Sequence, residues 1–202
     1  MKSETVLLIT SAQNDLLAPG GKAWSLVQAS VQENRVPEKL ALLANAARQA
    51  AIPVLHSPVV LDHDALAGFD GLSAIQRLML EQRLLGAGTR GSGWIEESRP
   101  RQGDIVLEPR RGFSSFWAGT IKDHLVALGA KTLYIAGMLA EGCVSSHARD
   151  AVENGYRPVV VSDAIGATSL EMLAAARLEL ALHTDALRPA AEVVAGWRRA
   201  VA

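Results

Sequence analysis

The sequence lacks the features that mark disulfide-bonded, membrane-spanning or nucleic-acid-binding proteins. Cys143 is the one cysteine among 202 residues, so no internal disulfide can form, and a lone thiol is typical of a reducing compartment. The 20 Lys and Arg residues balance 21 Asp and Glu, which leaves no basic surface for nucleic acid or anionic lipid. No apolar run approaches the roughly 18 residues of a membrane helix, and the N-terminal run is too short for a signal peptide. We therefore expect a cytoplasmic protein that binds neither nucleic acid nor membranes.

Apolar runs alternate with helical patterns along the whole chain. Hydrophobic residues make up 49% of the sequence, which suits one domain covering residues 1–202. Nearly continuous aliphatic runs are typical of strands buried on both faces of a parallel sheet. We expect strands at 5–10, 53–58, 104–107, 132–137, 158–163 and 184–187, and helices at 37–51, 117–129, 144–155 and 169–183. This alternation predicts an α/β protein with a three-layer Rossmann-like fold, a central parallel sheet flanked by helices.

A parallel sheet of this kind places its ligand site at the carboxyl ends of the strands. That rule selects four segments: 11–15, His56 with its neighbours, 109–116 and 139–143. The segment 61–100 is different, because it is rich in glycine and carries scattered charge. We expect it to form a long excursion with one helix near 73–85, and excursions of this length often cover a site.

The strongest local signal for chemistry is GMLAEGCVSSHARD, which begins at Gly137. An apolar strand ends at Gly137, a tight turn follows, and a helix begins at Cys143. A helix N-terminus favours a thiolate through its dipole, and its free N–H groups suit an oxyanion. The sequence is equally compatible with a small buried residue in a strand-to-helix turn, so spacing leaves both roles for Cys143 open.

Four separated motifs resemble the isochorismatase-like hydrolases, also called the cysteine hydrolase superfamily. The cysteine segment matches through GCV, ARDA and NGY, and LLITSAQNDLL resembles the family's first strand with its Asp-x-Gln-Asn-Asp-Phe motif. GTRGSGW resembles a mid-chain Gly-Thr-x-Gly segment, and EPRRGFSSFWAGT resembles a Lys-x-x-x-Ser-x-Phe segment. The motifs agree in order and spacing over nearly the whole chain. The resemblance implies hydrolysis by an Asp-Lys-Cys triad in which cysteine attacks an amide or nitrile carbon.

The chain departs from that triad at two of its three positions. Ser11 stands where the resemblance places the Asp, and Arg110 stands where it places the Lys. A hydroxyl cannot take a thiol proton as a carboxylate does, although it can relay a proton or bind a ligand. Arginine keeps its charge and offers a planar fork suited to an anion. These changes make the expected site more positive by about one charge, which favours an anionic ligand and a Cys143 thiolate.

The expected catalytic residues are therefore Cys143, Arg110 and Ser11. By the same resemblance, the expected substrate-binding residues are Gln13, His56, Phe116, Ala140 and Gly142. Asp15 and Glu141 are considered as replacement bases, but support of a loop and a solvated turn are the simpler interpretations. His147 lies one helical turn after Cys143, where it either acts as a base or packs the helix.

The sequence supports two hypotheses about function. The first is a cysteine hydrolase that cleaves an amide-type C–N bond in a small anionic substrate, with Ser and Arg in the altered triad. The second is a catalytically impaired member that binds a small ligand or a partner, because both substitutions fall on catalytic positions. The resemblance implies a homodimer or homotetramer. We expect no cofactor and no metal, since His56, Asp62, His63 and Asp64 lack the spacing of an Asp-x-His-x-x-His zinc cluster.

Overall fold

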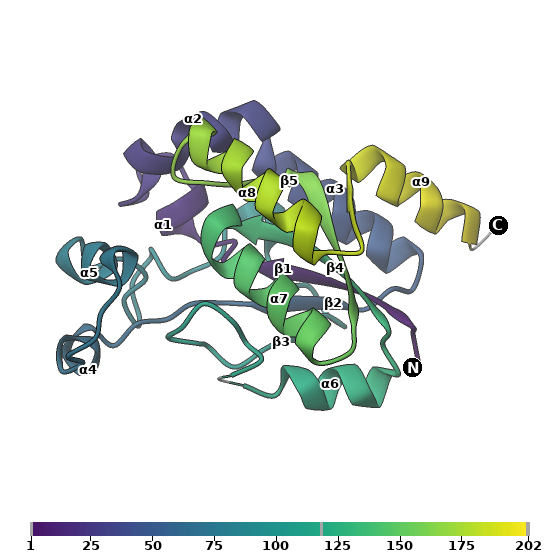
Figure 1. Ribbon diagram of the computed structural model, residues 1–202, viewed down its shortest axis with the longest axis horizontal. Helices are drawn as coiled ribbons and strands as arrows, with labels where there is room; N and C mark the ends of the chain where they lie inside the picture. Colours follow the sequence, from purple (N-terminus) through teal and green to yellow (C-terminus); the bar gives the residue numbers. More distant parts are fainter. Residues whose placement is uncertain (1, 118, 201–202) are drawn as a thin grey trace.

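A six-stranded, all-parallel sheet forms the centre of the protein (Figure 1). The computed structural model describes residues 2–117 and 119–200. The strands are β1 (Thr5–Thr10), β2 (Val54–Ser57), β3 (Ile105–Val106), β4 (Thr132–Met138), β5 (Arg157–Gly166) and β6 (Ala186–Arg188). Their order across the sheet is β3-β2-β1-β4-β5-β6. The predicted α/β fold class with a central parallel sheet is confirmed, and each predicted strand overlaps one of these six.

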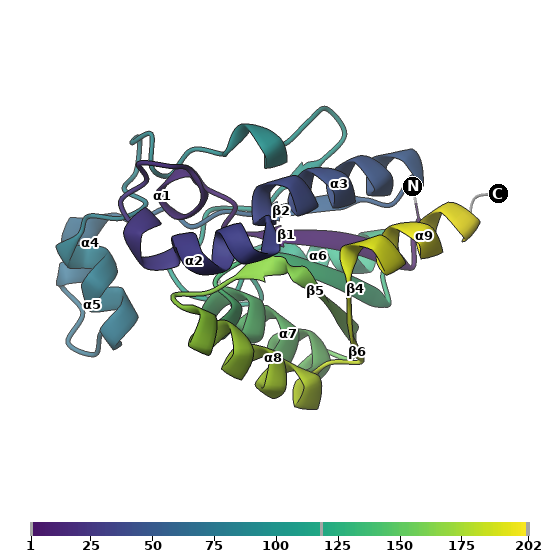
Figure 2. The same ribbon diagram turned by 90° about the horizontal axis from the view of Figure 1, so that it is seen from above.

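Helices cover both faces of the sheet (Figure 2). One face carries α2 (Trp24–Asn34), α3 (Val36–Gln49) and α9 (Ala190–Ala200). The other carries α6 (Ile121–Leu128), α7 (Ser145–Glu153) and α8 (Leu170–His183). Each face has its own apolar core, and the inward aliphatic side chains of β1 alternate between them: Leu7 and Ile9 on the first, Val6 and Leu8 on the second. The three layers follow from strands that are apolar on both sides.

The sequence missed α2 because this helix buries polar side chains. Two of its four buried residues are Ser30 and Asn34, which interrupt the apolar stripe that marks an amphipathic helix. The Ser30 hydroxyl donates to the carbonyl of Ala167 at 2.6 Å, and the Asn34 amide donates to that of Ile165 at 2.7 Å. These partners lie at or after the end of β5, more than 100 residues away along the chain, so local sequence cannot supply them. The short α1 (Asn14–Leu17) and the terminal α9 were also missed.

The excursion between β2 and β3 contains two short helices, α4 (His63–Ala67) and α5 (Ala74–Glu81), and a 3₁₀ turn at Glu96–Ser98. Figure 1 shows α4 and α5 at the end of the molecule opposite the two chain termini. The Ser73 side chain accepts from the N–H of Gln76, and Gln76 reaches back to Ser73, which forms a capping box and starts α5. The helix predicted near 73–85 is therefore present but ends earlier. Of the predicted helix 117–129, residue 118 lies outside the described residues.

The neighbouring strands β1 and β4 form the switch point of the sheet, where the strand order reverses. Thr10 pairs with Gly137 in the register of these strands. Gly137 has φ 119°, and a Cβ there would lie 2.0 Å from the carbonyl oxygen of Thr10. Glycine is thus required for the two strand ends to approach, and this approach brings the segments after β1 and β4 together.

Some apolar side chains remain on the surface of α8. Leu170, Leu178 and Leu182 are exposed on this helix, and the predicted association with further copies of the chain stays a prediction.

In the described part of the chain, no helix combines the length and the apolar character that spanning a bilayer would need.

The contact at Gly137 gives a direct test of the fold. We expect Gly137→Ala to lower the free energy of unfolding by about 3 kcal/mol or more, because the methyl group has no room. Gly129 also has positive φ, at 73°, but a Cβ added there would meet no atom within 4 Å. Gly129→Ala is the matched control and should cost about 1 kcal/mol. Urea unfolding measures both, and equal losses would contradict the close-approach argument.

Candidate active site

Ser11, Arg110 and Cys143 meet at the carboxyl ends of β1 and β4. Ser11 follows β1 directly and adopts φ 52°, a left-handed conformation that is uncommon for a residue with a side chain. Cys143 lies in a π-helical turn, Ala140–Val144, between β4 and α7, and such turns are frequent at functional sites. Arg110 arrives from the segment after β3 and has no exposed surface. The switch point of the sheet therefore gathers the three residues that the sequence selected.

The guanidinium of Arg110 is held by hydroxyl and carbonyl oxygens. Its Nη2 donates to the hydroxyls of Ser11, at 2.8 Å, and Thr10. Its Nη1 donates to the carbonyl of Gly112 at 3.3 Å. Burial lowers the pKa of Arg110, and Cys143 opposes that shift through charge and hydrogen bonding. The sulfur of Cys143 is thus a direct electrostatic neighbour of a buried cation.

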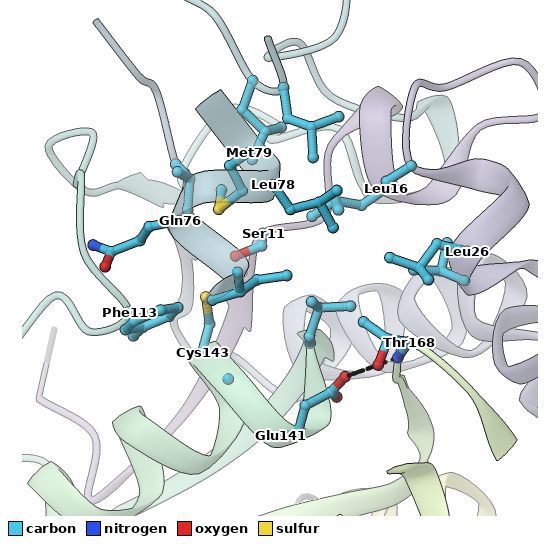
Figure 3. A pocket seen from close by; sticks show the side chains of 18 of the residues that line it. Ser11, Leu16, Leu26, Gln76, Leu78, Met79, Phe113, Glu141, Cys143 and Thr168 are labelled. Carbon is cyan, nitrogen blue, oxygen red and sulfur yellow. Dashed lines mark hydrogen bonds between the residues drawn. The ribbon is translucent and has the colours of Figure 1, made fainter. Parts of the chain in front are cut away.

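Cys143 and Ser11 both lie on the wall of a cavity of about 500 Å³. Figure 3 shows the Cys143 sulfur and the Ser11 oxygen on the same side of this space, with Leu78 and Met79 of α5 above them. Cys143 is half-buried, so a ligand in the cavity can reach its sulfur while Arg110 stays behind it. Arg110 does not line the cavity.

His147 fixes the backbone of the cysteine turn. Its Nε2 accepts from the N–H of Ser115 at 3.0 Å, so the proton resides on Nδ1, which donates to the carbonyl oxygen of Cys143 at 2.6 Å. Burial, together with the charge of Arg110, lowers the pKa of His147 to about 3. Both ring nitrogens are engaged with backbone groups, so His147 has the packing role rather than that of a base facing the thiol.

The two carboxylates considered as replacement bases are also engaged. Asp15 Oδ2 accepts from the N–H of Leu85 at 2.7 Å, and its Oδ1 accepts from that of Lys22 at 3.3 Å. Glu141 Oε1 accepts from the N–H and the hydroxyl of Thr168 at 2.8 and 2.6 Å (Figure 3). Glu141 Oε2 is buried with no hydrogen-bond partner among the described residues. The bonds of Asp15 support a loop, in line with the simpler interpretation. Glu141 fixes a turn but is not the solvated carboxylate that the sequence suggested, because its Oε2 is buried.

The residues after Ser11 hold the excursion that carries α5. The Gln13 amide donates to the carbonyls of Val59 and Ser92, both at 2.7 Å, and accepts from the N–H of Val59 at 2.8 Å. Asn14 donates to the carbonyl of Arg90 at 2.8 Å. Together with the bond from Leu85 to Asp15, these contacts place α5 over the cavity. The amide of Gln13 therefore binds backbone groups of the protein and not a ligand in the cavity.

Four of the predicted substrate-binding residues do not line the cavity: Gln13, His56, Phe116 and Ala140. His56 is fully buried, and its Nε2 lies 3.0 Å from Asp104 Oδ2, which also binds Arg48 at 2.6 Å. Burial lowers the pKa of His56, against the opposing effect of Asp104. Phe116 packs in the core against His147, with 6.5 Å between ring centroids. Of this predicted group only Gly142 lines the cavity. Phe116 and Ala140 belong to the apolar core, whereas Gln13 and His56 bond to other parts of the chain.

The sequence did not identify the apolar wall of the cavity. Ile75, Leu78 and Met79 of α5 contribute to it, together with Leu26 and Val27 of α2. The three-and-four spacing within Ala74–Glu81 is the available signal, since it marks an amphipathic helix with an apolar face. Which surface this face covers is set by the contacts at Gln13, Asn14 and Asp15.

The described residues contain no group of three or more His, Cys, Asp or Glu side chains arranged to hold a metal ion. His63 and Asp62, which the sequence offers for this role, are used locally. Asp62 accepts from the N–H groups of Asp64 and Ala65 and caps α4, and His63 Nε2 lies 2.8 Å from the carbonyl of Leu84.

The depressed pKa of His147 predicts a loss of stability in mild acid. Between about pH 6.5 and pH 3 the unfolded chain binds a proton at His147 that the folded chain does not, so stability falls as pH falls. From pH 7 to pH 5 we expect this residue alone to cost about 2 kcal/mol. Urea unfolding at both values should show a smaller pH dependence in His147→Gln than in the unmodified protein. An unchanged slope would contradict a neutral, buried imidazole; His56, shifted in the same direction, accounts for part of the remaining slope.

The bonds of Asp15 predict a structural role that can be separated from chemistry. Asp15→Asn leaves one acceptor oxygen for two N–H donors, and we expect it to cost about 1–3 kcal/mol in urea unfolding. The pH profile of Cys143 alkylation by iodoacetamide should stay unchanged. Asp70→Asn, at an exposed carboxylate in the same excursion, is the control and should lie within about 0.5 kcal/mol. A profile altered by Asp15→Asn would instead identify Asp15 as the base.

Comparison with known proteins places this site in a family. The model of the isochorismatase domain matches residues 5–192. The ureidoacrylate amidohydrolase RutB of Methylorubrum extorquens strain AM1 is 32% identical over 171 residues, covering 79% of this chain and 68% of that protein. An isochorismatase family protein from Desulfovibrio vulgaris superposes with a TM-score of 0.78 at 27% identity, covering 94% and 96% of the two chains. A cysteine hydrolase from Pseudomonas syringae shares the fold, with a TM-score of 0.82 at 18% identity over 98% and 93%. By these matches, and by the cysteine turn at the β1–β4 switch point, the chain belongs to the isochorismatase family.

Proposed function

We propose that the protein is a cysteine amidohydrolase that cleaves a C–N bond of a small molecule, with Cys143 as nucleophile and Ser11 and Arg110 in the altered triad. The observation that carries this proposal is the position of Cys143. Its sulfur borders a 500 Å³ cavity and has a buried guanidinium as its electrostatic neighbour. A relative with 32% identity is an amidohydrolase by name, which supports the same reaction class.

The first step uses the charge of Arg110. A cation within a few ångströms favours the thiolate over the thiol, which supplies the nucleophile without a carboxylate base. The thiolate attacks the carbonyl carbon, and the carbonyl electron pair moves onto its oxygen. Gly142 and Val144 donate their N–H groups to the carbonyl of Leu139, at 3.1 and 3.0 Å. We assign the developing oxyanion to the N–H of Cys143 itself, at the start of the helical segment.

Ser11 then transfers a proton to the leaving group. Its oxygen accepts from Arg110 Nη2 at 2.8 Å and lies 3.4 Å from the Thr10 hydroxyl, and its own hydrogen can turn toward the cavity. Because Cys143 is already a thiolate, the proton that the leaving amine needs comes from water in the cavity, and the Ser11 hydroxyl relays it to the nitrogen as the C–N bond breaks. Arg110 stays protonated and moves no proton, since guanidinium does not ionise near neutral pH. Water then attacks the thioester and gives up a proton to solvent through the Ser11 hydroxyl. The C–S bond breaks, the acid leaves, and Cys143 returns as the thiolate.

A second candidate is a family member that binds a small molecule without converting it. The observation in its favour is that Asp15, considered as a replacement base, accepts backbone N–H bonds through both of its oxygens, and that Glu141 accepts from Thr168 through Oε1. A hydroxyl relay is weaker than a carboxylate base, so loss of turnover with retention of the cavity fits the same geometry.

Alkylation of Cys143 tests the activation of the nucleophile. Because it is the one cysteine, uptake of iodoacetamide reports on this thiol alone. At pH 7 we expect Cys143 to react faster than a free thiol, and Arg110→Gln to slow the reaction about tenfold by removing the neighbouring charge. Arg101→Gln, at an exposed arginine that does not line the cavity, is the matched control and should leave the rate unchanged. Equal rates in both variants would contradict activation by Arg110.

Turnover separates the two candidate functions. Release of ammonia from primary amides should be measurable in the unmodified protein and abolished in Cys143→Ala. If the unmodified protein is inactive while Ser11→Asp with Arg110→Lys gains activity of about 100-fold or more over background, the binding role is correct. The Ser11→Asp change alone is the control, since it places a carboxylate beside an unchanged arginine.

A further inference from the structure

The apolar character of the cavity wall points to a substrate that the charge of the altered triad does not suggest. Its lining includes Leu16, Ala23, Leu26, Val27, Ile75 and Leu78, with Met79, Leu139 and Met172 further around the wall. Leu26 and Met172 are 40% and 41% exposed although they border the site. Apolar groups of this size gain free energy when a ligand removes them from water.

No buried cation faces this space from the described residues. Arg110 donates from Nη1 and Nη2 to Thr10, Ser11 and Gly112, and its side chain does not line the wall. Its Nε is buried with no hydrogen-bond partner among the described residues. Arg111 lines the cavity, but it is exposed, and its guanidinium lies 5.6 Å from the ring centre of Phe69. The one carboxylate on the wall is Glu141, which would repel an anion. A carboxylate buried against the apolar part of this wall would therefore lose its hydration, and among the described lining residues it would meet no buried cation.

We propose that the cavity takes neutral amides with an extended apolar acyl group, placed against α5, with the carbonyl carbon at Cys143. This inference rests on the proposed function and replaces the anionic substrate expected from the sequence. The volume of about 500 Å³ lies within the usual range for small-molecule sites. Because α5 buries none of its residues completely, Ile75 and Leu78 are available to the ligand, and Met79 borders the cavity while it also packs against the core.

A series of straight-chain primary amides tests the proposal. With two to eight carbons, kcat/KM should rise about fourfold per methylene until the cavity is full, as expected for burial of one CH₂. The same amides ending in a carboxylate should be at least about tenfold poorer at equal length. A preference for the carboxylate series would overturn this inference while leaving the amidohydrolase proposal intact.

Two variants of α5 locate the acyl group. Leu78→Gln should flatten the dependence on chain length, and Ala74→Phe should shorten the longest chain accepted, because both side chains line the cavity. Glu81→Gln lies on the same helix, is exposed and does not line it, so it should match the unmodified protein. Thermal unfolding confirms that each variant is folded. If the α5 variants changed the oligomer mass in light scattering and left the chain-length profile unchanged, the apolar wall would be an interface between copies, which overturns the inference.

A binding measurement separates this inference from the proposed function. Calorimetry of octanamide with Cys143→Ala should show binding with a negative heat-capacity change, and Leu78→Gln in that background should weaken it. If no amide is hydrolysed by the unmodified protein but octanamide binds in this way, the apolar site stands and the enzymatic proposal fails. If short anionic amides are hydrolysed and octanamide neither binds nor reacts, the apolar site fails and the enzyme stands.

Discussion

Arg110 carries its charge without exposed surface, and a charge in such a place is stable only when hydrogen bonds and neighbouring polar atoms replace water. Two hydroxyls at the end of β1 and one carbonyl provide part of that replacement, and Nε has no hydrogen-bond partner among the described residues. These bonds tie the end of β1 to the segment after β3, and they hold Ser11 on the cavity wall that it shares with Cys143.

The residues that follow β1 contribute both to the candidate active site and to the position of the excursion. Ser11 faces the cavity and Arg110, whereas the side chains of Gln13, Asn14 and Asp15 bind backbone groups of the excursion between β2 and β3. That excursion positions α5, and α5 provides much of the apolar wall. Gln13, Asn14 and Asp15 bond to backbone atoms of the excursion and not to its side chains. Substitutions on α5 can therefore change the ligand that fits the cavity while the residues at the strand ends stay the same.

The charge of the site and the polarity of its cavity are separate properties in this protein. Arg110 keeps its charge near neutral pH, and its Nη1 and Nη2 donate to Thr10, Ser11 and Gly112. The proposed activation of Cys143 depends on this charge, since electrostatic effects extend beyond direct contact. The cavity wall instead consists mainly of leucine, isoleucine, valine and methionine side chains. The proposed activation of the thiol and the proposed selection of the substrate thus depend on different residues.

The sequence by itself determined the parallel sheet and the meeting of Ser11, Arg110 and Cys143, because strand-like aliphatic runs and the rule for carboxyl strand ends are local and topological. It could not determine the partners of buried polar groups. His56 binds Asp104, Gln13 binds Val59 and Ser92, and His147 binds Ser115 and Cys143, mostly across tens of residues. Only the tertiary structure decided that Arg110 lies outside the cavity wall while apolar side chains of α5 line it. The reason is that the direction of a side chain depends on its hydrogen-bond and packing partners. These partners lie far away in the sequence, and the spacing of residues does not identify them.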